Sequence, residues 1–410
     1  MTAAPDLDFP PVPQSAPMSF SGRGGEFFGM LVKGSLLMIP TFGFYRFWLI
    51  TKLRRHLWAN TQVAGETFEY TGTGKELLIG FLIALAVLTP LYLGYFILGI
   101  LLEEAAALAS LPLVVFMYVL THFGVYRARK YRATRTTFRG IRFWMKGSGW
   151  AYAFRAILWD LATLLTLGLA LPWAMASLER YRMRHTYFGN VQGDFAGTGW
   201  TLLKRGWWVW LLGWAIIVGS IALAATASKT NREGPDLVAG LLTLGIFGGL
   251  IALGPLAMAI FTRWQLEGIR FGGVVVSSNL GIGSLYGLFF KWLFSSIGFA
   301  IAFAVFVAIL VGIFYVAFQG AFQNLNSEKF QGLTPASISF FVGSAIVYLL
   351  LLLGMGVLQR YFFGRGLWVL VVSSATFANL QIVDQVVAAG QASGSLGEGL
   401  ADALDFNVGI

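Results

Sequence analysis

The chain has 410 residues, of which 57% are hydrophobic and only 12% are charged, and its mean hydropathy is +0.71. This composition excludes an ordinary soluble protein and indicates a multi-span membrane protein. Cysteine is absent, which excludes disulfides, thiolate metal sites and thiol nucleophiles. The net charge of +10 indicates loops that face an anionic membrane leaflet rather than a nucleic-acid partner.

The N-terminal region combines a polar tail with an interrupted apolar segment. Residues 1–17 are rich in proline and lack the basic and apolar regions of a signal peptide, so we interpret them as a disordered tail. The segment Phe27–Trp48 follows, and it contains Lys33, Pro40 and Arg46. It is either a poor spanning helix or a pair of short helices that enter and leave the bilayer on one side.

Six uncharged runs are long enough to cross a bilayer, which takes roughly 20 residues. Short linkers join them in pairs, so the sequence predicts three helical hairpins. The runs are Leu77–Leu102, Ala105–Tyr126, Trp207–Ala227, Leu237–Phe261, Trp292–Phe318 and Ile338–Leu358. A further apolar segment, Trp150–Leu178, contains Arg155, Asp160 and Pro172 and has the same two interpretations as Phe27–Trp48.

The chain also resembles itself at several offsets. Lys130-Tyr131-Arg132 and Gly147-x-Gly149 align without a gap on Arg180-Tyr181-Arg182 and Gly197-x-Gly199. Such similarity, with inserts of unequal length, indicates one recurring module. Each module has a Gly-x-Gly start, an apolar insert, a basic aromatic helix end and two β-like stretches. A membrane domain, 18–380, divides into modules 18–70, 71–145, 146–195, 196–280 and 281–380.

The distribution of cations indicates the topology. If every module begins and ends on one side, the short inserts must return to that side. The Lys and Arg residues then gather there, apart from Lys229, Arg232 and Lys329 opposite and Lys33 within the first insert, as the positive-inside rule requires. We therefore predict six transmembrane helices in three hairpins plus two re-entrant or broken segments, with eight spans as the alternative.

The residues after each basic helix end favour two short strands around a tight turn. Asn60–Thr71 and His185–Ala196 place Thr, Val, Phe and Tyr around Gly or Asn. One such hairpin is marginal alone, and we expect five of them, with Met18–Ser21, to pair into a β-layer under the membrane. The predicted fold class is an α-helical multi-span membrane protein with short repeated cytoplasmic β-hairpins.

Helix breakers lie near the middle of both short inserts. They are Pro40, Gly43, Gly168 and Pro172. Irregular backbone at membrane depth is tolerated where it is buried in protein or lines a cavity, so the breaks indicate a pathway or a ligand pocket. The alternative is that Pro and Gly only kink ordinary spans.

Lys33, Arg155 and Asp160 are the charges within the apolar inserts, where each costs about 2.5–3.5 kcal/mol on insertion scales. We interpret them as a buried cluster that binds an ion, a proton or an anionic solute. Arg155 and Asp160 are about 140° apart on a regular helix, so Asp160 could pair with Lys33 instead. The alternative is that the side chains snorkel to the interface, above all Arg155.

The densest basic run follows directly after a predicted span. Its cations Arg127, Arg129, Lys130, Arg132 and Arg135 are predicted to contact anionic lipid headgroups. Aromatic residues between them would also suit single-stranded nucleic acid, but the position beside the membrane favours lipid, and no nucleic-acid partner is predicted.

Enzyme signatures are missing from the sequence, which has no His-Glu-x-x-His, phosphate loop or Gly-x-Ser-x-Gly elbow. We expect no catalytic residues, no metal and no cofactor. Residues 381–410 are a separate acidic segment, in which Leu396–Phe406 predicts an amphipathic helix. This helix is expected to dock on the basic face of its own chain or on a cytoplasmic partner, and a homo-oligomer is also compatible with the sequence.

The chain contains Phe20-Ser-Gly-Arg-Gly-Gly-Glu-Phe-Phe, Asn60-Thr61, Phe68-x-Tyr70-Thr-Gly-Thr-Gly, Thr166-Leu-Gly with Pro172-Trp173, and Glu398-Gly-Leu-Ala-Asp-Ala-Leu-Asp. Together these motifs resemble the YjgN-like family of bacterial inner-membrane proteins, over nearly the whole chain from Phe20. The resemblance implies a Gram-negative cytoplasmic membrane and supplies no activity or catalytic residues. The first insert departs from the Thr-Leu-Gly pattern, because it reads Ile39-Pro-Thr-Phe-Gly-Phe.

The sequence thus predicts an integral cytoplasmic-membrane protein with its basic loops in the cytoplasm. The predicted function is that of a transporter, channel or lipid-translocating protein of unknown substrate. The alternative is a non-transporting scaffold or lipid-binding protein that recruits partners through its cytoplasmic face.

Overall fold

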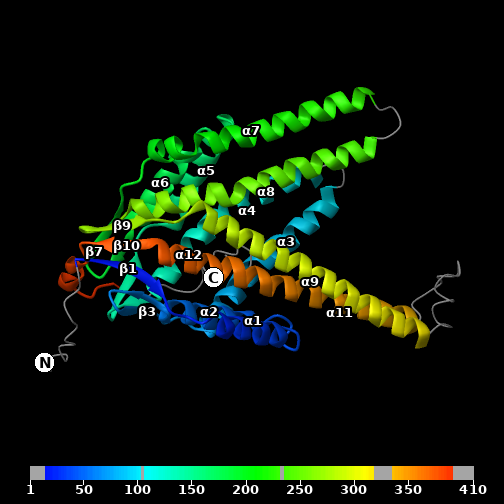
Figure 1. Ribbon diagram of the computed structural model, residues 1–410, viewed down its shortest axis with the longest axis horizontal. Helices are drawn as coiled ribbons and strands as arrows, with labels where there is room; N and C mark the ends of the chain where they lie inside the picture. The colour runs from blue at the N-terminus through cyan, green and yellow to red at the C-terminus, as the bar shows by residue number, and fades with distance from the viewer. Residues whose placement is uncertain (1–13, 103–105, 231–234, 318–334, 391–410) are drawn as a thin grey trace.

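The computed structural model of the chain describes residues 14–102, 106–230, 235–317 and 335–390. Within these residues, short strands alternate along the chain with groups of helices. The strands gather at one end of the molecule, and the helices extend away from them (Figure 1).

The strands of the described residues close into one antiparallel barrel. Each strand pairs with the strands before and after it in the chain, and β10 pairs with β1 to complete the ring. The strands are β1 (Ser15–Phe20), β2 (Thr61–Val63), β3 (Glu66–Tyr70), β4 (Thr136–Phe138), β5 (Ile141–Met145), β6 (Thr186–Phe188), β7 (Val191–Phe195), β8 (Ile269–Phe271), β9 (Val274–Ser278) and β10 (Ala375–Ala378).

The barrel shows that the predicted fold class, an α-helical multi-span protein with short β-hairpins, is wrong. Partners such as Phe143 and Phe188 are joined across β5 and β6, although a whole pair of helices separates these strands in the chain. Local patterns do not show which strand edges meet, and closure removes every exposed edge. Strand β1 begins at Ser15, so residues 15–17 belong to the barrel and not to the predicted tail.

Tight turns join β2 to β3 and β4 to β5, where no helix lies between the strands. Ala64 and Gly65 have φ angles of 53° and 84°, and Arg139 and Gly140 have φ angles of 51° and 75°. Two consecutive left-handed residues suit the twist of an antiparallel hairpin. These turns lie at one end of the barrel, so the helices all leave from the other end.

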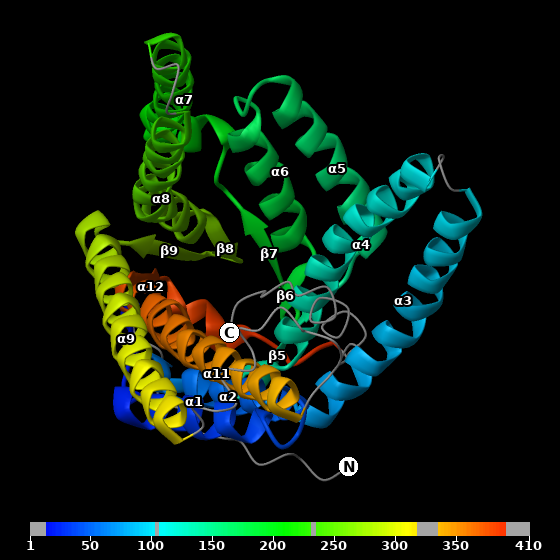
Figure 2. The ribbon, with the colours of Figure 1, turned by 90° about the vertical axis from the view of Figure 1, so that its right-hand side faces the viewer.

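In the part of the chain that the structure describes, five groups of helices connect the strands. They are α1 (Gly24–Met38) with α2 (Arg46–Ala59), α3 (Gly74–Leu102) with α4 (Ala106–Thr134), α5 (Gly149–Leu165) with α6 (Leu171–Arg184), α7 (Gly199–Thr230) with α8 (Pro235–Gly268), and α9 (Ile282–Ala317) with α11 (Pro335–Gln359), the π-helix η2 (Arg360–Gly366) and α12 (Leu367–Ser374). Figure 2 shows these groups standing in chain order around the barrel.

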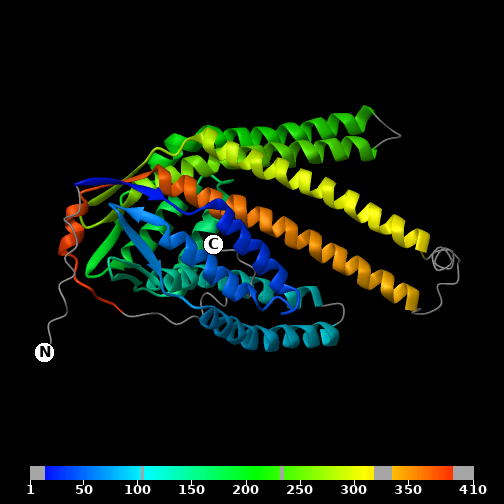
Figure 3. The ribbon, with the colours of Figure 1, turned by 60° about the horizontal axis from the view of Figure 1, so that its bottom comes forward.

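The groups differ in length. Six helical stretches in the described residues are long and apolar enough to cross a membrane: Gly74–Leu101, Leu111–Thr134, Gly199–Leu223, Thr243–Gly268, Ile282–Gly312 and Val342–Ser374. Helices α1, α2, α5 and α6 have only 14 to 17 residues, fewer than the roughly 20 needed. Both short pairs turn back to the barrel, and in Figure 3 the α1–α2 pair ends well before α9 and α11.

Aromatic side chains fill the barrel. Phe138 and Phe188 are buried, and the Phe138 ring contacts Phe68 and Phe188 at centroid distances of 4.8 and 6.3 Å. The Phe143 ring contacts Phe188 and Phe271 at 4.6 and 5.9 Å. The bore is therefore a packed hydrophobic core.

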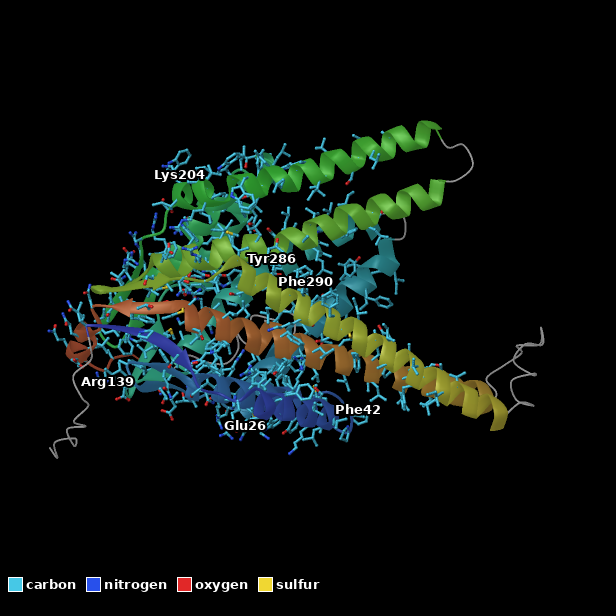
Figure 4. All side chains as sticks on the ribbon, viewed as in Figure 1. Glu26, Phe42, Arg139, Lys204, Tyr286 and Phe290 are labelled. Atoms are coloured by element: carbon cyan, nitrogen blue, oxygen red, sulfur yellow. The ribbon has the colours of Figure 1, made fainter. Side chains whose placement is uncertain are left out.

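The segment 379–390, here called the strap, lies across the turn end of the barrel. It includes the 3₁₀ helix η3 (Leu380–Gln385), and Leu380 is buried in the same apolar cluster as the barrel core. Arg139 Nη1 lies 2.6 Å from Asp384 Oδ1, and the Val387 amide donates to Asn190 Oδ1 at 3.0 Å. Figure 4 shows Arg139 at this end. The predicted helix Leu396–Phe406 lies outside the described residues.

Candidate functional site

The Gly-x-Gly motifs lie where a strand passes into the next group of helices. A Cβ at Gly72 would lie 2.6 Å from the Tyr70 ring, and one at Gly74 would lie 3.0 Å from Trp48. Gly197-x-Gly199 has equivalent contacts. The first glycine accommodates the last ring of the strand, and the second lets the new helix start close to the preceding group.

The predicted helix breakers form the turns of the two short pairs. Phe42 and Gly43 have φ angles of 49° and 84°, and Leu167 and Gly168 have φ angles of 51° and 91°. In each turn a threonine hydroxyl donates to a carbonyl four residues earlier, from Thr41 to Leu37 at 2.7 Å and from Thr166 to Ala162 at 2.8 Å. Pro40 lies within the turn between α1 and α2, and Pro172 lies in the first turn of α6.

The two inserts therefore share one turn. The first insert departs from Thr-Leu-Gly only in having Phe42 for leucine, and the left-handed pair of residues is kept. Both tips are apolar and exposed, with 93% of Phe42 and 75% of Leu165 accessible, and Phe42 lies at the far end of the α1–α2 pair (Figure 4). Such tips suit the hydrocarbon of one leaflet.

Two tryptophans on α7 hold the second tip. The indole Nε1 groups of Trp210 and Trp214 both donate to the Leu167 carbonyl, each at 3.1 Å. A turn leaves carbonyls without a helical partner, and at membrane depth water cannot replace that partner. The indoles satisfy this carbonyl and fasten the α5–α6 pair to its neighbour.

Asp160 lies in a polar cluster between α4 and α5. Its Oδ2 accepts a hydrogen bond from the Tyr118 hydroxyl at 2.5 Å and lies 3.0 Å from His122 Nε2. The Tyr118 and His122 rings contact edge to face at 4.9 Å. Both residues belong to the candidate span Leu111–Thr134, so the cluster lies along a stretch of helix that is long and apolar enough to cross a membrane.

The other two predicted intramembrane charges do not join this cluster. Lys33 is exposed on α1. Arg155 is exposed on α5, and its guanidinium lies 4.9 Å from the centre of the Tyr181 ring. Among the described residues, the structure brings Asp160 together with Tyr118 and His122 instead. The sequence carries a signal for this site, because His122 is a polar residue within the apolar run Ala105–Tyr126.

A second cluster surrounds Glu179 on α6, which is 1% exposed. Glu179 Oε1 accepts from Arg129 Nη2 of α4 at 3.0 Å, and its Oε2 pairs with Arg182. Burial alone would raise the pKa of Glu179, but the Arg129 and Arg182 guanidiniums outweigh it and hold that pKa below its ordinary value. The sequence did not indicate this site, because Glu179 lies in a run that looks uniformly basic.

The predicted headgroup-binding cations are of two kinds. Arg129 pairs with Glu179, and Arg135 donates to both oxygens of Glu76, at 2.8 and 3.1 Å. The other three, Arg127, Lys130 and Arg132, are half-buried near the end of α4. Headgroup contact stays a prediction for all five, and the two paired arginines already have an anionic partner.

The described residues contain no group of three or more His, Asp or Glu side chains arranged to hold a metal ion. The clusters around Asp160 and Glu179 can instead form hydrogen bonds and ion pairs. The Asp160 side chain is 40% exposed and can bind a polar group from outside the protein, whereas Glu179 is enclosed by protein.

Comparison with known proteins gives the chain its family. Residues 15–239, more than half of the chain, match the model of the family described as "Bacterial protein of unknown function (DUF898)". The chain belongs to this family. It thereby also belongs with the YjgN-like proteins, which confirms the resemblance.

Among curated relatives, "Inner membrane protein YjgN" of Escherichia coli (strain K12) is 31% identical over 145 residues, which are 34% of each chain. Its namesake in Salmonella typhimurium is 26% identical over 138 residues, which are 33% of each chain. The match thus spans about a third of the relatives' length. No solved structure matches the chain. The relatives and the six candidate spans establish a multi-pass integral protein of the inner membrane.

Proposed function

We propose that this member of the DUF898 family moves an amphipathic substrate, such as a phospholipid, between the two leaflets along its α4–α5 face. The observation that supports this most is the exposure of Asp160. Its side chain is 40% accessible at the depth of a candidate span. An ionisable group that faces hydrocarbon costs about 2.5–3.5 kcal/mol, and a polar headgroup passing the cluster would offset that cost.

The filled barrel also favours a path between helices. Phe138 and Phe188 occupy the bore, and the strap covers its turn end, so a polar solute has no route along the barrel axis. The proposed movement needs no covalent chemistry and no cofactor. Positive-inside bias supports an orientation with the barrel in the cytoplasm, and the recurring Gly-x-Gly turns support an origin from one repeated module.

The test is lipid movement in proteoliposomes. Nitrobenzoxadiazole-labelled phosphatidylethanolamine reaches external dithionite only after it crosses to the outer leaflet. We expect the wild-type protein to speed its bleaching and Asp160→Asn to lower that rate at least tenfold. Asp194→Asn is the matched control, because Asp194 is an exposed carboxylate of β7 that pairs with Arg184. Equal rates for Asp160→Asn and wild type would contradict the proposal.

The second candidate is a non-transporting scaffold that recruits a partner through its cytoplasmic face. The strap favours it, because this segment gives the barrel end a fixed, ion-paired surface around Arg139 and Asp384. Wild-type protein that moves no ions, small solutes or labelled lipids would favour the scaffold.

A further inference from the structure

Four helices that begin at the barrel each carry an exposed cation at a similar height. These cations, here called the collar, are Lys33 on α1, Arg155 on α5, Lys204 on α7 and Lys291 on α9. They follow the second glycine of their Gly-x-Gly motifs by five to nine residues, which corresponds to about 8–14 Å along a helix. The fifth such helix, α3, has an exposed lysine directly after its first residue instead, at Lys75.

The helix surface changes from charged to apolar within one turn of each collar cation. The residues three positions further from the barrel lie on the same face of the helix. They are Leu36, Leu158, Trp207 and Phe294, and each is between 52% and 68% exposed. A cation followed by exposed apolar side chains is the pattern of a helix that enters a bilayer, because the charge stays with the headgroups and the apolar side chains contact hydrocarbon.

The collar cations form no ion pair with a carboxylate in the described part of the chain. Position along the helix does not explain this, because Arg205, the residue after Lys204, pairs with Glu267 at 2.7 Å. The Lys204 ammonium instead lies 5.5 Å from the centre of the Trp200 ring, and tryptophan is typical of membrane interfaces. The charge of the collar is therefore available to an anion from outside the protein.

The helices that carry the collar stand on different sides of the ring (Figure 2). A single protein partner would contact one side, whereas lipid surrounds the molecule. Lys204 and Lys291 also belong to candidate spans, in the part of each span nearer the barrel, and Figure 4 shows Lys204 at that end of α7. The partner that fits all four cations is thus one leaflet of a membrane.

We propose that the collar binds the phosphates of anionic phospholipids in the leaflet nearest the barrel. Lysine and arginine beside an anionic leaflet are attracted to it, and the attraction falls off within a Debye length. Lys33 and Arg155 thereby contact headgroups from the two short pairs of helices, and their charges are not buried in hydrocarbon. The collar does not depend on the proposed translocation, because lipid binding is measured at equilibrium and without transport.

The test measures lipid selectivity in proteoliposomes. Electron spin resonance of chain-labelled lipids gives the fraction held at the protein surface, for phosphatidylglycerol and for phosphatidylcholine. The collar variant replaces all four collar cations with glutamine. The matched control removes the same charge from residues on or beside the barrel strands, with Arg142→Gln, Lys146→Gln, Arg184→Gln and Arg270→Gln.

We expect the wild-type protein to select phosphatidylglycerol over phosphatidylcholine roughly threefold, since each cation near the surface attracts anionic lipid. The collar variant should lose this selectivity, and the control should keep it. Sodium chloride at 1 M, where the Debye length is about 3 Å, should abolish the selectivity of the wild-type protein. A collar variant as selective as the wild type would overturn the proposal. So would an equal loss in both variants, or a wild-type selectivity that 1 M salt leaves unchanged.

Discussion

Glu179 shows how one buried charge can join two helices. Its two oxygens bind arginines from α4 and α6, and these guanidiniums keep its pKa below the ordinary value despite burial. A carboxylate without them would be strongly destabilising at this depth of burial. The cluster therefore has a structural role at the base of the helices, where the α4 and α6 ends approach the barrel.

The pairing of Glu179 predicts a specific pH dependence. Because its folded pKa is depressed, the stability it contributes is complete above the ordinary value of 4.5 and is lost as the pH falls through the lower folded pKa. Glu179→Gln should cost about 3–5 kcal/mol at pH 7, since two cations lose their buried partner. The melting temperature in detergent, followed between pH 7 and 3, checks both effects.

An exposed carboxylate provides the control for the Glu179 prediction. Asp194→Asn removes an exposed carboxylate, and it should cost less than about 1 kcal/mol. A Glu179→Gln protein that melts like the wild type at pH 7, and with the same acid sensitivity, would contradict the assigned role.

Residue patterns revealed some sites and not others. Asp160 could be chosen from the sequence because a carboxylate in an apolar run is rare. Its partners could not, because Tyr118 and His122 lie 42 and 38 positions earlier in another helix. The suggested pairing of Asp160 with Lys33 assumed that charges pair with charges. The structure instead uses a phenol and an imidazole.

The short pairs of helices are the elements that distinguish this fold from a simple bundle. Helices α5 and α6 are joined by a turn whose free carbonyl is bound from α7. The short length of the apolar segments and their helix-breaking Pro and Gly residues identified these elements in the sequence. A helix of 17 residues extends only ~26 Å, which is less than the thickness of the bilayer's hydrocarbon core. The indole contacts were not visible, because α7 tryptophans look like ordinary interface residues.

Because both indoles bind one carbonyl, we predict that the effects of substituting Trp210 and Trp214 are not additive. Trp210→Phe and Trp214→Phe alone should each have a small effect, since the remaining indole still binds the Leu167 carbonyl. The double variant leaves that carbonyl unsatisfied, which costs several kcal/mol in hydrocarbon. Hydrogen exchange of residues 164–170 in nanodiscs should rise at least tenfold in the double variant. Strictly additive changes would show that the indoles act only by packing.

At the scale of the whole molecule, the sequence indicates where helices and short strands lie but not how they assemble. Strands β2 to β9 read as halves of small hairpins because turn residues such as Ala64-Gly65 are local signals, whereas β10 follows a group of helices and is not part of the fifth hairpin that the sequence predicted. Closure depends on pairs such as Ser15 with Ala378, whose separation in the chain leaves no local pattern. The strap was likewise not anticipated, because its contacts are made to three separate turns.

The strap predicts a charge-swap effect on the barrel end. Arg139→Glu and Asp384→Arg should each loosen residues 380–387, because each places like charges at a contact that now measures 2.6 Å. The combined swap restores opposite charges and should recover most of the protection. Hydrogen exchange of the strap measures this coupling. A double variant as exposed as the sum of the single variants would show that the ion pair does not hold the strap.

We propose that the five groups of helices in the described residues leave one end of a barrel that lies in the cytoplasm, and that the two short pairs do not cross the membrane. The absence of native cysteine allows single-cysteine labelling in intact cells at Thr67, Gln192 and Lys229. We predict that an impermeant maleimide labels position 229 from outside, and positions 67 and 192 only after permeabilisation. Labelling of position 67 or position 192 in intact cells would contradict the account.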